Sequence, residues 1–189
     1  MINLIRNLEE TKKELEHSNK KYERLAKTLP AVLYEYVLFP TGKNLCIYVS
    51  PKCEEVLGLN QKLFLEDMNN FWNLIHKEDL PKIIKADKIA NENNLNFFIE
   101  IRILFPITNE IRWLQLSSSP SEDFYENQRI WSGFILDITD KKRMEEQIFH
   151  YATIDSLTEI YNRRYFYEKL KIEIDHFIEH KKKFSILFF

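Results

Sequence analysis

Two histidines with the spacing of metal ligands lie in an acidic segment late in the sequence. His176 and His180 are four residues apart, and Asp175 and Glu179 precede them directly. Residues four apart share one face of a helix, and metal sites use this spacing. No matching third ligand accompanies them, and the basic run Lys181–Lys183 follows. We therefore interpret the pair as the solvated end of a helix and predict no metal site.

Thiol chemistry is limited to two cysteines, Cys46 and Cys53. Two cysteines cannot form a disulfide framework, and reduced, buried thiols are usual in proteins of the cytosol. A metal pair or a redox switch is the alternative. We predict that both thiols are structural.

The charge pattern does not indicate nucleic acid as a partner. The 189 residues carry a formal net charge of −2 at pH 7. The short basic runs, 141–143 and 181–183, have no interleaved aromatic residues, so solvated helix faces explain them better than a phosphate-binding surface. Three glycines are few for loops that cradle phosphates.

No segment of the sequence indicates a membrane span or a secretion signal. No apolar run approaches the ~20 residues of a spanning helix, and the N-terminus lacks a basic-then-apolar pattern. The hydrophobic content of 44% is enough for a packed core. We predict a cytoplasmic protein with no membrane segment in this chain.

A heptad pattern predicts an N-terminal amphipathic helix over residues 1–29, ended by Pro30. We expect a coiled coil with a second copy; the alternative is packing on the following domain. A polar residue at an a position can set the register of such a pair. The d positions are Leu8, Leu15, Tyr22 and Leu29, and the a positions are Ile5, Lys12, Asn19 and Ala26.

Residues 30–139 predict an α+β domain with a five-stranded antiparallel sheet and helices over one face. The strands are expected over 31–39, 45–50, 95–105, 111–119 and 129–138, with loops at 106–110 and 120–128. Ser50 is predicted to cap a short helix that stops at Gly58. Short helical pieces should fill 60–78. Asp79 is predicted to cap a longer helix that reaches about Asn93.

The strand over residues 95–105 alternates, so its isoleucines and Phe97 should share one face. This face either lines a pocket for an apolar or aromatic small molecule or packs as a filled core. The candidate pocket residues are Phe97, Ile99 and Ile101.

The domain resembles a PAS sensory domain of the bacterial kind. The matching stretches are VSP (49–51), VLG (56–58), FW (71–72), IHKED (75–79), EIR (100–102), IRW (111–113), WSG (131–133) and DIT (137–139). The turn at 106–110 lacks the Asp-Gly that is common in the family. The resemblance implies a sensor for a small molecule whose identity is unknown.

Some members of this family bind haem or a flavin, and we expect neither cofactor here. His76 stands where the family commonly has a histidine with or without haem, so we assign it a role in structuring its loop. Cys53 lacks the short motif that surrounds the reactive cysteine of flavin photosensors.

Residues 155–164, DSLTEIYNRR, are similar to the opening signature of GGDEF domains, the diguanylate cyclases. Glu159 stands where a small residue is usual. A helix over 165–180 and an apolar β run over 184–189 should follow. The resemblance covers 155–189, part of an α/β domain of roughly 160 residues. The metal-binding Asp and the Gly-Gly-Asp/Glu-Glu-Phe hairpin of the family do not occur in this stretch.

Between the PAS-like region and the GGDEF-like region, we predict a signalling helix over residues 140–154. The resemblance implies that Asp155 pairs with Arg163 or Arg164 and fastens this helix to the cyclase domain; a helix cap at Asp155 is the alternative. Ile160 corresponds to a position near the guanine pocket of a complete domain. The predicted junction residues are Asp137, Thr139, Asp155, Asn162, Arg163 and Arg164.

Together these features predict the sensor and dimerisation module of a bacterial signalling protein. A complete protein would convert two GTP to cyclic di-GMP with Mg²⁺ on a homodimer, whereas this chain alone should be inactive. A ligand-binding or dimerisation module with a relic cyclase tail is the alternative. No phospho-acceptor histidine motif follows Thr139, as a histidine kinase would require.

Overall fold

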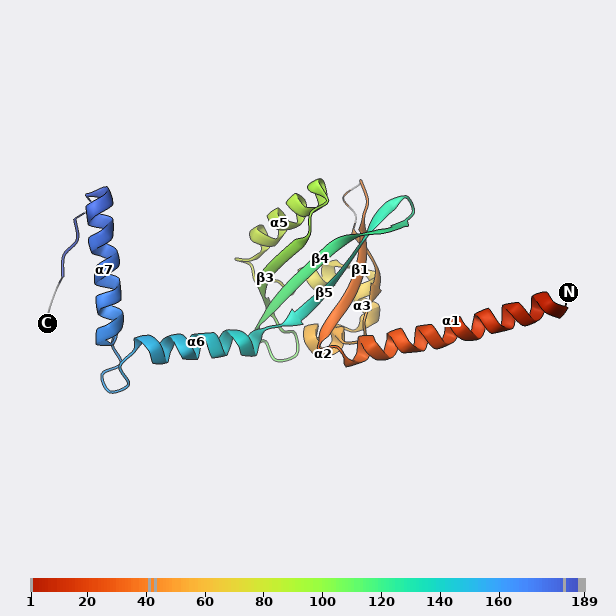
Figure 1. Ribbon diagram of the computed structural model, residues 1–189, viewed down its shortest axis with the longest axis horizontal. Helices are drawn as coiled ribbons and strands as arrows, with labels where there is room; N and C mark the ends of the chain where they lie inside the picture. Colours follow the sequence, from red (N-terminus) through yellow and green to blue (C-terminus); the bar gives the residue numbers. More distant parts are fainter. Residues whose placement is uncertain (1, 41, 43, 182, 187–189) are drawn as a thin grey trace. The chain divides into compact units, whose positions relative to one another are not determined.

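The computed structural model describes residues 2–40, 42, 44–181 and 183–186, and side chains from residue 11 onward (Figure 1). By contacts, the chain divides into one unit over residues 1–139 and another over 140–189, and each is described by itself. Among the described residues, no helix combines the length and the apolar character that crossing a membrane requires.

The N-terminal segment is helical, as predicted. Helix α1 spans Ile2–Thr28, directly before Leu29 and Pro30. Ala26 is buried, whereas Leu15 and Tyr22 are exposed. The side chains of Ile5 and Leu8 lie outside the described residues. An exposed apolar stripe suits a coiled coil, and the pairing stays a prediction.

Five antiparallel strands form one sheet, in the order β2-β1-β5-β4-β3 (Figure 1). The α+β class and the five-stranded sheet that we predicted are confirmed. Three hairpins form, β1 with β2, β3 with β4 and β4 with β5, and β5 also pairs with β1, so that β2 and β3 are the edge strands. The strands are β1 (Ala31–Leu38), β2 (Asn44–Val49), β3 (Phe97–Leu104), β4 (Ile111–Tyr125) and β5 (Gln128–Asp137).

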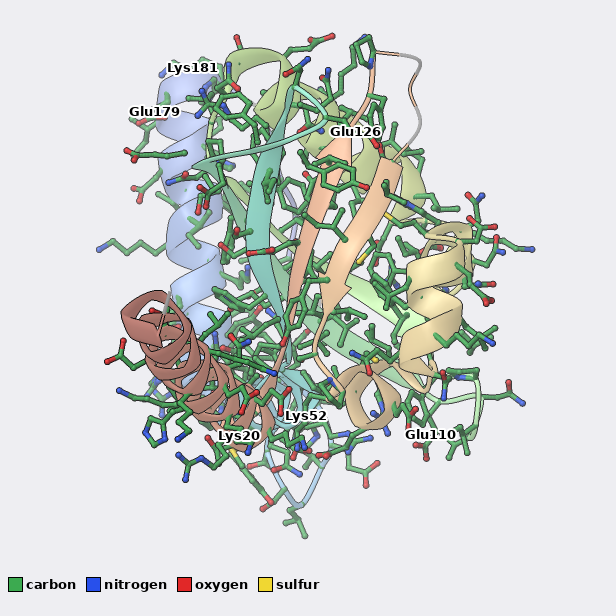
Figure 2. The ribbon with its side chains drawn as sticks, turned by 90° about the vertical axis from the view of Figure 1, so that its right-hand side faces the viewer. Lys20, Lys52, Glu110, Glu126, Glu179 and Lys181 are labelled. Carbon is green, nitrogen blue, oxygen red and sulfur yellow. The ribbon has the colours of Figure 1, made fainter. Side chains whose placement is uncertain are left out.

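Four helices connect β2 to β3 and cover one face of the sheet. Helix α2 packs beside β1, α3 beside β2 and α5 beside β3. The core lies in the layer between them. Glu110, directly before β4, and Glu126, in the turn between β4 and β5, are exposed (Figure 2). The bounds of these helices are α2 (Cys53–Leu57), α3 (Gln61–Glu66), α4 (Asn69–Trp72) and α5 (Leu80–Asn93).

Our prediction that Ser50 caps the first short helix is wrong. Helix α2 begins at Cys53, and its N-cap residue, Lys52, makes no side-chain cap. Ser50 Oγ instead accepts a hydrogen bond from the Leu33 backbone N–H, at 3.0 Å. A long-range donor on β1 therefore takes the oxygen that a local cap would use. The predicted stop is confirmed, since Gly58 has a φ of 68°.

Asp79 occupies the N-cap position of α5, but its side chain does not cap the helix. Its carboxylate accepts hydrogen bonds from Arg102 on β3 instead. Asp79 Oδ2 lies 2.8 Å from the Arg102 backbone nitrogen, and Oδ1 lies 2.8 Å from Nη2. A charged donor makes a stronger bond than a helix amide, so the ion pair wins over the cap.

The segment 120–128, which we predicted as a loop, belongs mostly to the sheet. Strand β4 continues to Tyr125, and β5 begins at Gln128. The two-residue turn between them places Glu126 and Asn127 at φ 47° and 61°. This conformation is typical of tight hairpins. Polar, solvent-facing residues of an extended hairpin look like a loop when only the sequence is read.

The second unit contains two helices joined by a short loop. Helix α6 spans Thr139–Thr153, where the signalling helix was predicted, and α7 spans Arg163–His180. Residues 184–186 do not form the predicted strand, and 187–189 lie outside the described residues. A strand needs a hydrogen-bonded partner, and none of the described residues provides one for this stretch.

Candidate functional site

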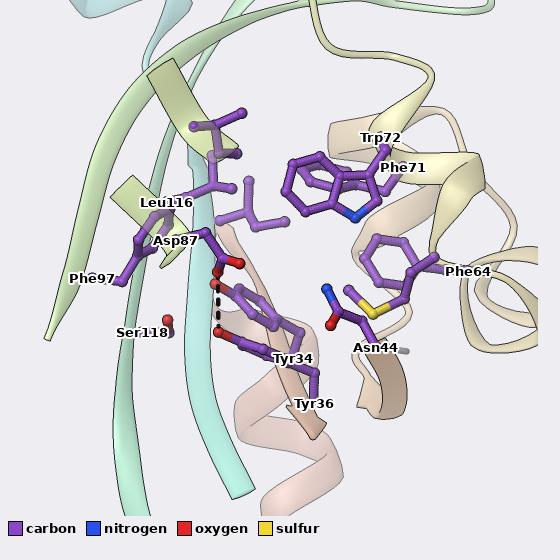
Figure 3. Close-up of a pocket in the computed structure, with 13 residues that line it drawn as sticks. Tyr34, Tyr36, Asn44, Phe64, Phe71, Trp72, Asp87, Phe97, Leu116 and Ser118 are labelled. Atoms are coloured by element: carbon purple, nitrogen blue, oxygen red, sulfur yellow. Dashed lines mark hydrogen bonds between the residues drawn. The ribbon is translucent and has the colours of Figure 1, made fainter. Parts of the chain in front are cut away.

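A small, mostly apolar cavity lies between the sheet and helices α3, α4 and α5 (Figure 3). Its free space is about 40 Å³, enough for a few water molecules. Pockets for drug-sized ligands usually exceed about 300 Å³. The residues that line it are Tyr34, Tyr36, Asn44, Phe64, Met68, Phe71, Trp72, Ile83, Asp87, Phe97, Leu116, Ser118 and Ile135.

Asp87 is the one carboxylate among the lining residues, and it points from α5 toward the tyrosines of β1 (Figure 3). The Tyr36 hydroxyl donates a hydrogen bond to Asp87 Oδ1 across 3.5 Å. Burial raises the pKa of the Asp87 carboxyl. Burial also raises the pKa values of Tyr34 and Tyr36, so both phenols stay protonated. Hydrogen bonds from Asn91 and Tyr36 lower the pKa of Asp87 in part, so the cavity holds a carboxylate whose partners are neutral.

Two further polar atoms at the cavity lack a hydrogen-bond partner among the described residues. Ser118 Oγ on β4 is buried, and so is Asn44 Oδ1 on β2. Unsatisfied polar atoms are costly in a protein interior, and they often mark the place of a water or a ligand.

The tyrosines are held in place by stacking and by a glycine. The rings of Tyr34 and Tyr36 are 6.1 Å apart, and Trp131 stacks on Tyr36 at 6.2 Å. A Cβ atom on Gly133 would come within 2.4 Å of the Ser117 carbonyl oxygen and within 2.8 Å of Tyr34 Cζ. Gly133 therefore leaves room for the Tyr34 ring and for the neighbouring strand β4.

Of the three residues expected at a pocket, only Phe97 lines this cavity. Ile99 and Ile101 are buried in the core but do not line it. Residues two apart on a strand are separated by roughly 6.6 Å, so one inward side chain reaches a small cavity while the next packs elsewhere.

The sequence analysis missed Asp87, which is the chemically most distinctive residue of the cavity. Ile83 and Ala90 mark the buried side of α5, and Asp87 lies between them at helical spacing. A carboxylate inside an apolar helical stripe is a signal that can be read from sequence.

His76 lies in the turn before α5 and does not line the cavity. Its Nδ1 accepts a long hydrogen bond, 3.4 Å, from the Glu78 backbone N–H.

The two cysteine thiols are buried, and burial raises the pKa of Cys46 to about 12 and of Cys53 to about 11. Thiols of such high pKa are unreactive at neutral pH.

A second polar cluster lies where β5 passes into α6. Asp137 Oδ1 accepts hydrogen bonds from the backbone N–H and the hydroxyl of Thr139. Thr139 Oγ1 in turn accepts one from the Trp113 backbone N–H on β4, at 2.9 Å. Arg112 approaches Asp137 to 3.7 Å. Thr139, the first residue of α6, is thereby tied to β4 and β5.

The expected pair between Asp155 and an arginine does not form in the structure. Asp155 Oδ1 accepts hydrogen bonds from Thr158, and these lower the pKa of its carboxyl. Arg164 Nε lies 3.4 Å from Glu168, and Arg163 lies over the ring of Tyr167. The local turn satisfies the carboxylate. Asp155 does not cap a helix either, since residues 156–158 form a turn and the N-cap of α7 is Asn162.

Asn162 closes the loop between α6 and α7. Its Nδ2 donates to the Ala152 carbonyl at 2.9 Å, and its Oδ1 caps α7 through the Tyr165 N–H. The backbone N–H of Asn162 also donates to the Thr153 carbonyl. Ile160 in this loop is exposed.

His176 and His180 lie on α7, which has no buried residue. Their rings are 5.9 Å apart. Within the described part of the chain, no group of three or more His, Cys, Asp or Glu side chains is arranged to hold a metal ion.

Two family models match this chain. Residues 46–135 match the PAS fold, and residues 152–189 match the diguanylate cyclase GGDEF domain in part. The chain therefore contains a PAS domain followed by part of a GGDEF domain. This organisation fits a signalling module of a cyclase.

Solved structures support the fold of the first domain. The N-terminal domain of a diguanylate cyclase with PAS/PAC sensor from Marinobacter aquaeolei is 18% identical, with a TM-score of 0.50 over 59% of this chain and 98% of that one. A sensory box histidine kinase/response regulator from Burkholderia thailandensis is 20% identical, with a TM-score of 0.51 over 80% of this chain and 98% of that one.

An RNA-binding light-oxygen-voltage receptor has a TM-score of 0.56 at 18% identity, over 71% of this chain and 37% of that one. Such low identities establish the fold alone. A comparison with the curated proteins found no match.

Proposed function

We propose that the PAS domain senses a small molecule in its cavity and that α6 passes the signal to a diguanylate cyclase output. One observation carries the proposal: strands β4 and β5 supply residues both to the cavity and to the hydrogen-bonded cluster at the start of α6. On β5, Ile135 lines the cavity and Asp137 stands two residues further on. On β4, Ser118 lines the cavity, and the Trp113 N–H holds Thr139 at the start of α6.

A ligand that shifts β4 or β5 would therefore act directly on the first turn of α6. Packed elements respond to small shifts by moving between discrete arrangements. The exposed apolar residues of α6, Met144, Ile148 and Tyr151, are spaced to form a seam with a second copy. We propose that the chain works as a parallel homodimer, through this seam and through the exposed stripe of α1.

The output proposed for a complete protein is the condensation of two GTP to cyclic di-GMP. The acids that bind the divalent cations in the family are not among residues 155–189. This chain accordingly supplies sensing and transmission, and catalysis is assigned to a complete GGDEF domain. The purified chain should make no cyclic di-GMP from GTP and Mg²⁺.

Insertions that rotate one half of α6 relative to the other test whether this helix transmits the signal. Inserting one residue beside Glu146 rotates the downstream half of α6 by about 100° and should change cyclic di-GMP production strongly in a protein with a complete cyclase domain. Inserting seven restores the seam and should largely rescue it. A steady decline with insertion length, or no dependence on it, would show that α6 is only a tether.

Sedimentation tests the dimer separately. Deleting residues 1–29 should weaken the association of the chain measurably, because it removes the heptad stripe of α1. A chain that is monomeric before the deletion, at high micromolar concentration, would refute the homodimer.

A further inference from the structure

The cavity has an unbalanced electrostatic character. Asp87 is its single carboxylate, and none of its described lining residues is Lys, Arg or His. Removing a carboxylate from water costs free energy unless a positive charge or several hydrogen bonds compensate. The hydrogen-bond partners of Asp87, which are Tyr36 at 3.5 Å and Asn91, are both neutral. A cation in the free space would supply the missing compensation.

The walls of the cavity also suit a cation, because six of the lining residues are aromatic. The faces of aromatic rings carry partial negative charge and attract ammonium groups, and carbon atoms next to the charge pack well on them. The aromatic residues are contributed by β1, α3, α4 and β3 (Figure 3). They are Tyr34, Tyr36, Phe64, Phe71, Trp72 and Phe97.

The oxygen atoms on one side of the cavity match the donors of a primary ammonium group. Ser118 Oγ has no hydrogen-bond partner in the described residues, and the Asp87 carboxylate lies on the same side of the cavity (Figure 3). An ammonium group has three N–H donors and no acceptor. A carboxylate ligand would instead meet Asp87 as a like charge.

A hollow next to the cavity also has negatively charged walls. A second hollow of about 300 Å³ shares Asn44, Met68 and Trp72 with the cavity, and its walls include Glu66 and Asp67. Its described lining residues include no basic side chain. Acidic walls raise the local concentration of cations and lower that of anions.

We propose that the cavity binds a small organic cation, a short primary alkylammonium whose nitrogen lies against Asp87 and Ser118 and whose carbon atoms contact the aromatic walls. This rests on the proposed sensing function and specifies its ligand class. The free space of about 40 Å³ limits the ligand to roughly four non-hydrogen atoms. A ligand of this size binds at best with about 6 kcal/mol, so dissociation constants in the millimolar to high micromolar range are expected.

Three probes of nearly equal size separate the ligand classes: propylammonium chloride, 1-propanol and sodium propionate, at matched ionic strength. Binding to the purified chain is followed by the NMR shift of the Trp72 indole N–H, assigned with Trp72→Phe, because this ring lies in the cavity wall. Propylammonium should bind, and Asp87→Asn should weaken it by about tenfold or more. Ser118→Ala should weaken it less. Asp123→Asn removes an exposed charge on the β4–β5 hairpin and should leave binding unchanged.

Each other outcome overturns the proposal. If 1-propanol or propionate binds as tightly as propylammonium, the cavity still senses a ligand but the cation class is wrong. If Asp87→Asn, shown to be folded by circular dichroism, binds propylammonium like the wild type, the carboxylate is not the recognition group. If no probe moves the Trp72 signal up to about 50 mM, a concentration above the expected dissociation constants, the cavity does not take this ligand. The insertion series in α6 still tests transmission in that case.

Discussion

Tyr36 on β1 donates a hydrogen bond to Asp87 on α5, with 3.5 Å between the oxygen atoms. This is a long bond for a hydroxyl and a carboxylate, which usually approach to about 2.5–2.7 Å. It joins β1 to α5, the helix that packs beside β3. Burial raises the pKa of the Asp87 carboxyl, and its hydrogen-bond partners Asn91 and Tyr36, both neutral, only offset this in part.

Asp87→Asn should stabilise the unliganded chain at neutral pH, because the amide can still accept from Tyr36 and carries no charge. The gain should shrink as the pH falls. The folded state binds the Asp87 proton more tightly than the unfolded state does, so stability rises as pH falls through the raised pKa toward the ordinary value of 3.8. The facing groups, Tyr34 and Tyr36, have raised pKa values and do not titrate in this range.

Urea unfolding of the wild type and of Asp87→Asn between about pH 4 and 7 measures this difference. A wild type that is more stable than the variant at neutral pH would show that the charged carboxylate has stabilising partners. That result would also argue against the unbalanced charge of the cavity.

Asp79→Asn should destabilise the chain by roughly 1.5–3 kcal/mol at neutral pH, because it removes a charge-assisted pair with Arg102. The Arg102 guanidinium holds the pKa of Asp79 below 3.8. A depressed pKa contributes stability that is present above 3.8 and is lost as the pH falls through the folded value. The two proteins should therefore converge only in strong acid.

Glu78→Gln is the matched control, because Glu78 contacts the same Arg102 nitrogen at 2.9 Å but its side chain is 72% exposed, against 12% for Asp79. Water screens such a pair, so the cost should stay below about 1 kcal/mol. Equal losses in the two variants, measured by urea unfolding, would contradict the ranking by burial.

Thr139→Val should destabilise the first domain by about 1–2 kcal/mol, because it removes the hydroxyl that accepts from Trp113 and donates to Asp137. In a protein with a complete cyclase domain it should also reduce the response to ligand. Thr139→Ser keeps the hydroxyl and should retain most of both properties. If Thr139→Val responds to ligand normally, transmission does not pass through this hydrogen bond.

Glu159→Gly should stabilise the loop between α6 and α7. Glu159 has a φ of 58°, which costs a residue with a Cβ about 1–2 kcal/mol. Glycine also gives the unfolded chain more conformational entropy, which offsets part of this gain. A net increase of about 0.5–1 kcal/mol in the free energy of unfolding is therefore expected. Glu159→Ala keeps the Cβ and serves as the control.

Hydrogen exchange of the Asn162 amide, which donates to the Thr153 carbonyl, reports this loop directly. Exchange should slow by about two- to fivefold in Glu159→Gly. Unchanged or faster exchange, with Glu159→Ala behaving the same way, would mean that the backbone conformation is not the limiting factor in the loop.

Local patterns in the sequence were sufficient to predict most elements. The heptads of residues 1–29, the alternation on β3 and the glycine stop at residue 58 each follow from neighbours a few positions away. Such periodicities determine which face of a helix or strand is apolar before any tertiary contact exists. They also located the junction, because residues 137–139 and 155–164 are short continuous motifs.

Only the tertiary structure decided which of these residues meet. Ser50 and Asp79 looked like helix caps, but donors from distant strands, Leu33 and Arg102, compete for their oxygen atoms. Phe97 reaches the cavity and Ile99 does not, because the register of the sheet and the packing of the helices decide where along β3 the cavity lies. Asp87 faces Tyr36 across fifty-one positions of sequence. No local period encodes such a pair, since it depends on how a helix packs over a sheet.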